Sequence, residues 1–204
     1  MALLNDLTIS QLLSRLVAFL LITAIHGFAL AGLARLLGDQ GPRYNGRFTL
    51  NPVPNMAMLG LVMALLFRIG WILPMRIDPA KLRFGRWGLV ICIVGSLLAV
   101  LVVIPVLIPL RPLAVIWLPR TTALAVLTVF DTIQDLAIWF VAFNVIPVPP
   151  LTAGLLFSAI KPSLTAAIWR RSKVLEVVML ALVVVGAASV VVEPIYRALR
   201  PLLS

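Results

Sequence analysis

The 204-residue chain is 62% hydrophobic and 12% charged, and its mean hydropathy is +1.13. Soluble domains carry about 45–50% apolar and about 25% charged residues, so the composition excludes a soluble globule and a disordered chain. The single cysteine excludes a disulfide scaffold or a cysteine-based zinc module. The net charge of +10 comes from basic residues that lie between apolar runs, which indicates orientation in a membrane and not nucleic-acid binding.

Four apolar segments are long enough to cross a membrane, which takes about 20 residues of helix. In chain order we predict spans at about residues 12–36, 87–109, 121–146 and 174–193. The first segment also resembles a signal peptide with a small-residue cleavage site at Ala29-Leu30-Ala31. Its apolar run continues to Leu37, however, and this favours a retained helix.

Residues 56–75 are apolar but contain Arg68 and end near Pro74. Basic residues concentrate on the cytoplasmic side of membrane proteins. If this segment does not cross, twelve Lys and Arg lie on one side and five on the other, whereas a crossing segment gives nine against seven. We therefore predict a re-entrant or interfacial hairpin over residues 44–75. The twelve are Arg35, Arg43, Arg47, Arg68, Arg76, Lys81, Arg83, Arg86, Lys161, Arg170, Arg171 and Lys173, and the five are Arg15, Arg111, Arg120, Arg197 and Arg200.

These segments predict an all-α integral membrane protein that forms a single transmembrane domain over residues 1–204. It has about four full transmembrane helices plus the hairpin, and both termini lie outside. We expect the inner (cytoplasmic) membrane of a bacterium as its location.

Three stretches carry sequence motifs in a fixed order. They are AIHGFALAGLARLLGDQGPRYNGRFTLNPVPNM (24–56), GWILPMRIDPAKLRFGRWGLVICIVGSLLAVL (70–101) and FNVIPVPPLTAGLL (143–156). The first resembles the HExxH helix and "GD…GR-T-LNP" segment of the site-2 protease family of intramembrane zinc metalloproteases. The second and third are similar to that family's "GW-x-x-P" region and "FN-x-x-P-x-PPLDG" motif. The resemblance is to short prokaryotic members without a PDZ domain, and it implies a site-2-protease-like core with a broken helix over 144–156.

The chemistry of that family requires particular side chains. In HExxH the two histidines bind one zinc ion and the glutamate is the general base, and in this family the LDG aspartate is the third ligand. At the matching positions this chain has His26, Gly27, Leu30 and Thr152, which we call the motif positions. A catalytic zinc site usually has three protein ligands. We therefore expect no catalytic residues, no metal site, no zinc or other cofactor, and a chain that is not an enzyme.

The resemblance implies that the family's groove for a membrane segment is retained. Asn144 matches an asparagine that helps to hold substrate backbone, and Asn51 matches the family's membrane-associated strand segment. Pro147, Pro149 and Pro150 cannot continue a regular helix, so the chain must unwind there. We expect these five residues to bind a segment, with the motif positions near the cytoplasmic side.

Asp131 and Asp135 lie four residues apart in an apolar helix and form a candidate intramembrane polar site. In one alternative Asp131 lies near the outer interface and only Asp135 is deeper. In the other, Asp135 bonds His26 or a basic side chain such as Arg68.

The leading interpretation is a catalytically inactive relative that binds or scaffolds other membrane proteins, for instance as an accessory subunit of a larger membrane complex. The alternative is an active intramembrane metalloprotease with a rebuilt metal site that uses His26 with Asp131 or Asp135. A small transporter or channel has little support beyond these two aspartates. The expected partners are membrane lipids and other integral membrane proteins, and no nucleic acid.

Overall fold

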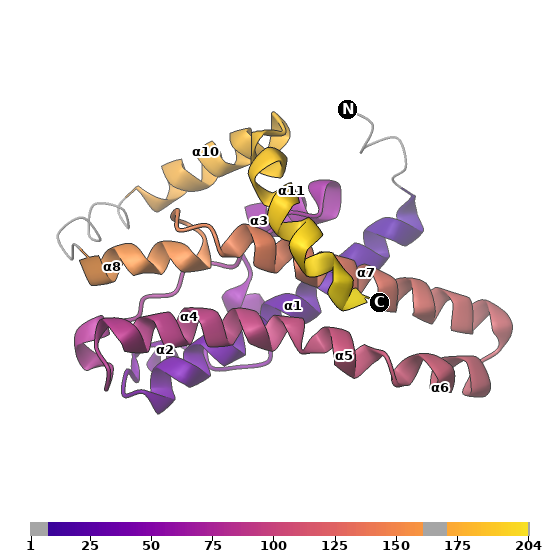
Figure 1. Cartoon of the computed structure of the whole chain (residues 1–204), viewed down its shortest axis with the longest axis horizontal. Helices are drawn as coiled ribbons and strands as arrows, with labels where there is room; N and C mark the ends of the chain where they lie inside the picture. The colour runs from indigo at the N-terminus through magenta and orange to yellow at the C-terminus, as the bar shows by residue number, and fades with distance from the viewer. Residues whose placement is uncertain (1–7, 161–170, 204) are drawn as a thin grey trace.

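The computed structural model describes residues 8–160 and 171–203, and the regular structure in these ranges is helical. An isolated antiparallel bridge joins Met56 to Ile72. These observations confirm the predicted all-α class (Figure 1). The helices are α1 (Ile9–Leu36), α2 (Gly41–Tyr44), η2 (Val53–Asn55), α3 (Met58–Phe67), η3 (Pro79–Lys81), α4 (Arg86–Leu101), α5 (Val103–Leu107), α6 (Leu110–Trp117), α7 (Arg120–Asn144), η4 (Thr152–Leu155), α8 (Leu156–Ile160), α10 (Ser172–Val184), α11 (Ala187–Leu199) and η5 (Arg200–Leu203).

Three helical segments of the described chain are long and apolar enough to cross a membrane. They are α1, the α4–α5 segment over Arg86–Leu107, and α7, and they lie at the first three predicted spans. Helix α1 begins at a cap in which the Thr8 hydroxyl accepts a hydrogen bond from the Gln11 amide, 3.2 Å away. It ends just before Gly38, whose φ of +119° turns the chain away.

The predicted fourth span, 174–193, is divided in the structure. Helices α10 and α11 together pass the same length and hydropathy test, but they are bent by 76° at the break between them. Gly186 stands at this break with a φ of +84°, a left-handed conformation that interrupts the helix. The described residues therefore contain three helical segments long and apolar enough to span and one bent pair, where the sequence predicted about four full helices.

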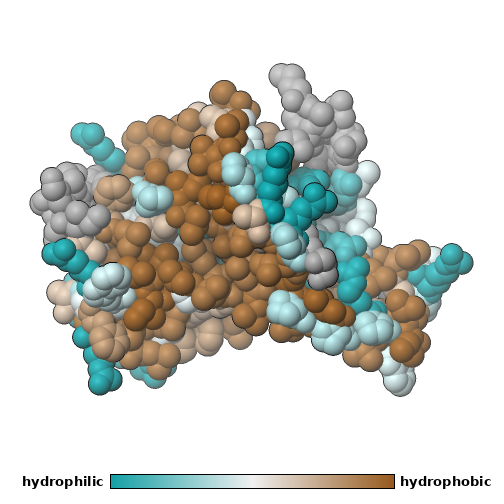
Figure 2. Space-filling view, viewed as in Figure 1, coloured by the Kyte–Doolittle hydropathy of each residue, from teal (hydrophilic) through white to brown (hydrophobic). Residues whose placement is uncertain are grey.

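The core forms where α1 packs against α4 and α7. Gly95 of α4 leaves the space into which Leu33 of α1 fits, since a Cβ atom at Gly95 would lie 2.7 Å from Leu33 Cδ1. Fully buried aromatic and aliphatic side chains from the three helices fill the interior: Phe19, Ile22, Leu30, Leu89, Leu136, Ile138 and Phe140. Exposed apolar side chains such as Leu98, Val102 and Ile116 cover the outside. Figure 2 shows one face of the molecule as a broad hydrophobic surface with hydrophilic side chains toward its edges, as expected for helices in contact with lipid.

Residues 56–72 form a helical hairpin. Helix α3 has 10 residues, about half the length that a membrane-crossing helix needs. Arg68 follows it with a φ of +63°, and the chain then returns until Ile72 pairs with Met56. Gly60 permits this return because any side chain there would overlap the backbone of Trp71.

The chain unwinds after α7, at the predicted broken-helix motif. Helix α7 ends at Asn144, and η4 begins at Thr152. Between them a turn (residues 145–151, here called the proline turn) carries Pro147, Pro149 and Pro150, with a cis peptide bond between the last two. The turn folds back on Gly154, where a Cβ atom would lie 2.6 Å from Pro149 N.

Candidate functional site

Two of the motif positions, His26 and Thr152, meet in the centre of the bundle. His26 Nε2 lies 2.9 Å from Thr152 Oγ1, and His26 Nδ1 lies 3.2 Å from the carbonyl oxygen of Ser96 on α4. A carbonyl oxygen only accepts, so Nδ1 donates to Ser96 and Nε2 of the neutral ring accepts from the Thr152 hydroxyl. The edge of the ring packs against Phe140 at a centroid distance of 5.1 Å. His26 is fully buried and both of its ring nitrogens have a partner.

Asn144 connects this pair to the end of α7 and to the hairpin. Its Nδ2 donates to the carbonyl oxygens of Gly70 (3.0 Å) and Phe140 (2.9 Å). Its Oδ1 lies 3.4 Å from the Thr152 amide nitrogen and 3.2 Å from Thr152 Oγ1. We call His26, Asn144 and Thr152 the buried polar cluster. The Asn144 side-chain amide thus bonds to Gly70 in the hairpin and to Thr152 after the proline turn, and it connects these two segments.

Gly27 and Leu30 have packing roles beside the cluster. A Cβ atom at Gly27 would overlap the side chain of Asn55, so the absence of a side chain lets Asn55 lie directly against α1. Leu30 is 1% exposed and belongs to the apolar core. In the resembled family both positions carry polar side chains. Here Asn55 of η2 lies against the Gly27 position, and the apolar Leu30 occupies the other.

Arg47 holds Asn55 in place. Its Nε donates to Asn55 Oδ1 at 2.7 Å, its Nη2 donates to the carbonyl oxygen of Leu73 at 2.6 Å, and Asn55 Nδ2 donates back to the Arg47 carbonyl oxygen at 3.3 Å. Burial lowers the pKa of Arg47 to about 10, which still leaves the guanidinium charged at neutral pH. From the sequence, Arg47 was predicted only as a topology charge, and Asn55 and Ser96 were not predicted as site residues. The short separation of Arg47 and Asn55 in the sequence was the only feature that could have indicated their pairing. The contact of Ser96 is made by its backbone carbonyl, which no side-chain pattern in the sequence indicates.

The remaining predicted groove residues lie apart from these hydrogen bonds. Asn51 is exposed, and its Oδ1 accepts from the Val53 amide at 3.1 Å, so it shapes its own loop. Pro147 is exposed and Pro150 is buried in the proline turn, with Pro149 between these extremes.

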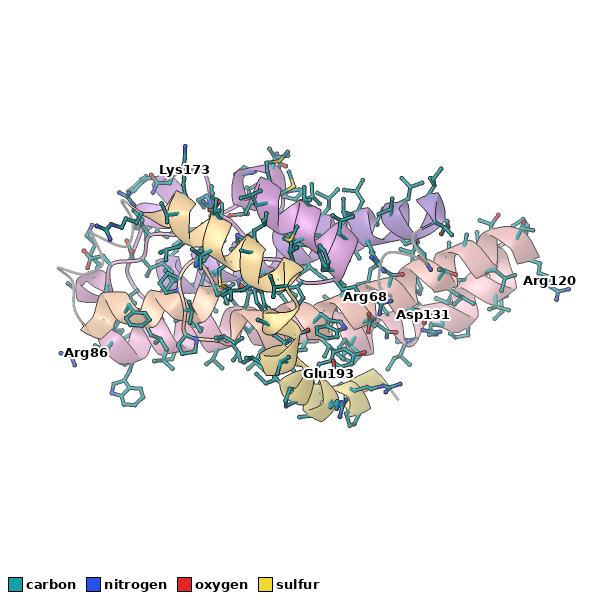
Figure 3. All side chains as sticks on the ribbon, turned by 90° about the horizontal axis from the view of Figure 1, so that it is seen from above. Arg68, Arg86, Arg120, Asp131, Lys173 and Glu193 are labelled. Carbon is teal, nitrogen blue, oxygen red and sulfur yellow. The ribbon has the colours of Figure 1, made fainter. Side chains whose placement is uncertain are left out.

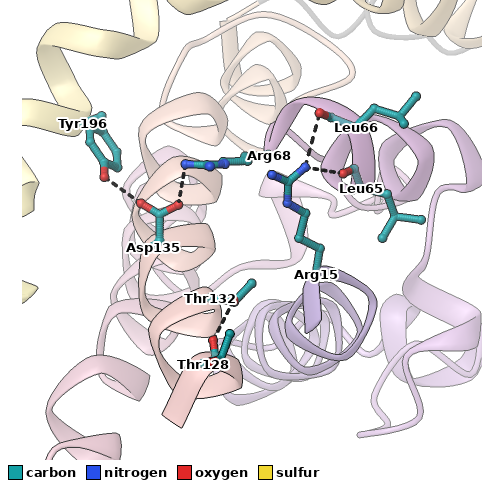
Figure 4. Close-up of polar contacts among 8 residues, drawn as sticks. All are labelled: Arg15, Leu65, Leu66, Arg68, Thr128, Thr132, Asp135 and Tyr196. Carbon is teal, nitrogen blue, oxygen red and sulfur yellow. Dashed lines mark hydrogen bonds and ion pairs between the residues drawn. The ribbon is translucent and has the colours of Figure 1, made fainter. Parts of the chain in front are cut away.

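The two aspartates have separate partners. Asp135 Oδ2 lies 3.4 Å from Arg68 Nη1, and its Oδ1 accepts from the Tyr196 hydroxyl at 2.6 Å (Figure 4). Asp131 is more exposed and pairs with Arg111 at 2.7 Å. Asp135 therefore bonds Arg68, one of the two partners considered, and not His26.

The donor set beside His26 does not fit a zinc site. Within residues 8–160 and 171–203 no group of three or more His, Cys, Asp or Glu side chains is placed to hold a metal ion. The Nε2 lone pair of His26 accepts the Thr152 hydroxyl, and a threonine hydroxyl is a poor replacement for a carboxylate ligand.

The fold and the site together define an all-helical membrane protein with a buried polar cluster at a broken helix. The chain is 26% identical over 200 residues to the protein named "Putative zinc metalloprotease YwhC" of Bacillus subtilis (strain 168), which covers 91% of this chain and 89% of the relative. No protein-family model and no solved structure matches the chain. The similarity to this relative supports a site-2-protease-like family.

This comparison corrects one expectation. The absence of the HExxH and LDG residues predicted a chain that is not an enzyme. The relative is named as a zinc metalloprotease, which points to a peptidase and contradicts that expectation.

Proposed function

We propose that the chain is a site-2-protease-like membrane protein that binds a membrane segment of another integral membrane protein beside the proline turn. In this function it acts as a binding or scaffolding subunit. The observation that carries the proposal is that the buried polar cluster fixes a non-helical turn next to three membrane helices while the outer edge of the turn stays exposed.

The exposed edge is apolar. Val145 is 44% exposed and Val148 is 42% exposed, and Pro147 between them is exposed as well. The inner side of the same turn is anchored by Thr152, which is 4% exposed: its hydroxyl donates to His26 Nε2 and its amide N–H donates to Asn144 Oδ1. The bonds of Thr152 therefore hold the exposed apolar edge of the turn in one position.

The backbone chemistry of the turn supports a polypeptide as the partner. Proline has no N–H, so the three prolines limit the hydrogen bonds that the turn can form within its own chain. Irregular backbone at membrane depth is tolerated only where protein or water satisfies its polar groups. An unwound segment of a second protein supplies both an apolar side-chain surface and backbone donors.

Crosslinking from a defined position tests this function. A photoreactive residue replaces Val148 in the full chain in its native membrane, and the matched control replaces Leu98, which is 54% exposed on α4. We expect Val148 to crosslink to a peptide that maps to a membrane segment of another protein, and we expect Thr152→Val to weaken that crosslink. Equal crosslinking at Val148 and Leu98, or crosslinks to lipid alone, would contradict the proposal.

A second candidate function is peptide-bond hydrolysis in the membrane, which the name of the relative favours. Because the described donors do not fit zinc, no catalytic step is assigned to His26. Zinc per purified chain, together with cleavage of the crosslinked partner, tests this candidate. About one zinc per chain and cleavage, both lost in His26→Ala, would establish a peptidase with a rebuilt metal site.

We also propose a bacterial inner membrane as the location, with the buried polar cluster toward the cytoplasmic side. Figure 3 places Arg86 and Lys173 toward one end of the molecule and Arg120 at the other. The positions of these three residues agree in direction with the charge division deduced from the sequence, whereas Arg68, counted with the cytoplasmic group, lines the same cavity as Arg15, counted with the opposite group. Two of the residues in that division, Lys161 and Arg170, lie outside the described residues.

A further inference from the structure

A polar cavity opens between α1, the end of α3 and α7, away from the buried polar cluster. Its volume is about 230 Å³. Liquid water takes about 30 Å³ per molecule, so the cavity has room for a group the size of a phosphate ester. Figure 4 shows Arg15, Thr128, Thr132 and Asp135 around this space. The complete lining is Gln11, Arg15, Arg68, Thr128, Asp131, Thr132, Asp135 and Leu136.

The two carboxylates of the lining are already neutralised. Asp135 is paired with Arg68 and accepts from Tyr196, and Asp131 is paired with Arg111. These two ion pairs leave Arg15 as the remaining charged side chain of the lining. The lining itself has two arginines and two aspartates, and with Arg111, which pairs with Asp131 from outside the lining, the charges at the site sum to one positive charge.

Arg15 is buried, and no carboxylate of the described residues lies within ion-pair distance of it. The residue is 7% exposed, and its Nη1 donates to the carbonyl oxygens of Leu65 (2.5 Å) and Leu66 (3.3 Å) at the end of α3. A guanidinium carries five N–H donors, and those on Nε and Nη2 have no acceptor in the described parts of the chain. Burying a charge that lacks a partner is costly, so the cavity favours an anionic ligand.

The depth of the cavity points to the source of this anion. Helix α1 has 28 residues, which makes it about 42 Å long, against a hydrocarbon core about 30 Å thick. Arg15 lies about 9 Å from the beginning of α1 at Ile9. A centred α1 therefore places Arg15 near one edge of the core, at the level of the lipid headgroups.

We infer that the cavity binds a phosphate-bearing anion, supplied in the membrane by a phospholipid headgroup. The free N–H groups of Arg15 contact the phosphate oxygens, and the Gln11 amide lies at the mouth of the site. The bound headgroup holds α1, α3 and α7 together at this end of the molecule. The inference is independent of the segment-binding function proposed above.

Lipid binding to the purified full chain tests this site. The delipidated protein in detergent is titrated with dioleoylphosphatidylglycerol or with inorganic phosphate, and native mass spectrometry measures the bound fraction. We expect one tightly bound lipid, with a dissociation constant that Arg15→Gln raises about tenfold. The matched control is Arg86→Gln, an exposed arginine at the other end of the molecule, which we expect to bind as the wild type does.

A second variant keeps the test valid if Arg15→Gln fails to fold. Thr128→Leu fills the cavity from an exposed position on α7 and leaves the bonds of Arg15 to α3 intact, and we expect it to weaken binding as well. Competition by inorganic phosphate would assign the site to a free anion, and its absence would assign the site to the lipid headgroup. Unchanged binding in both cavity variants, or equal loss in Arg86→Gln, would overturn the inference.

Discussion

His26 on α1 and Thr152 after the proline turn are 126 residues apart in sequence, yet Nε2 and Oγ1 lie 2.9 Å apart in the core. Both residues have a further contact: His26 Nδ1 donates to the Ser96 carbonyl oxygen, and Thr152 Oγ1 lies 3.2 Å from Asn144 Oδ1. The bond between His26 and Thr152 fixes the beginning of η4 against the middle of α1. The proline turn therefore takes its position from side chains on two different spans.

Thr152→Val removes the hydroxyl while it keeps the shape of the side chain. Nε2 of His26 then has no donor in a buried site, and a buried unsatisfied acceptor costs about 1–3 kcal/mol. We expect the variant to unfold at a lower temperature than the wild type in the same detergent. Thr121→Val, at an exposed position on α7, is the matched control and should leave the midpoint unchanged. Equal midpoints for the two variants would show that the bond to His26 adds no stability.

Asn144→Ala should destabilise the protein more than Thr152→Val. It leaves the carbonyl oxygen of Gly70 without its side-chain donor and the Thr152 amide N–H without its acceptor. Because Asn144 Oδ1 lies 3.2 Å from the Thr152 hydroxyl that donates to His26, the two changes act on one network, and the double variant should differ from the sum of the single changes by about 0.5–3 kcal/mol. A double-mutant cycle based on thermal or denaturant unfolding measures this difference. Strict additivity would mean that Asn144 and Thr152 act independently.

The spans and the buried polar cluster differ in how far the sequence predicts them. The first three spans are predictable because each is one apolar run of sufficient length. The bend at Gly186 is not, since hydropathy takes no account of a positive φ. The resemblance indicates that His26, Asn144 and Thr152 matter, but not that the Asn144 amide turns inward to Gly70. The pairing of Arg47 with Asn55 depends on the hairpin geometry, which charge counting does not contain.

Gly27→Ala tests the contact between α1 and Asn55 of η2. Alanine favours a helix over glycine by about 1 kcal/mol, so the change should stabilise a helix with free space at this position. Here the added Cβ overlaps the Asn55 side chain, and overpacking of this kind typically costs about 1–3 kcal/mol. We therefore expect net destabilisation in thermal unfolding.

Gly32→Ala on the same helix is the control for this change. Its Cβ would lie 3.1 Å from an edge atom of the Phe48 ring, a side chain that can shift, so the midpoint should stay level or rise. A Gly27→Ala variant as stable as Gly32→Ala would contradict the close approach of Asn55.

The two aspartates of α7 should respond differently to neutralisation. The Asp135 side chain is 26% exposed and holds Arg68 on the hairpin and Tyr196 on α11, whereas the Asp131 side chain is 60% exposed and pairs with Arg111. Exposed ion pairs contribute about 0–1 kcal/mol, and hydrogen bonds to a charged group about 1.5–3 kcal/mol. Asp135→Asn should therefore destabilise the protein, and Asp131→Asn should have little effect. Tyr196→Phe should reproduce part of the Asp135→Asn loss, because the Tyr196 hydroxyl joins α11 to α7 through that carboxylate. The three unfolding midpoints, measured in one detergent, check this order, and an equal effect of the two Asp→Asn changes would show that Asp135 does not connect the three elements.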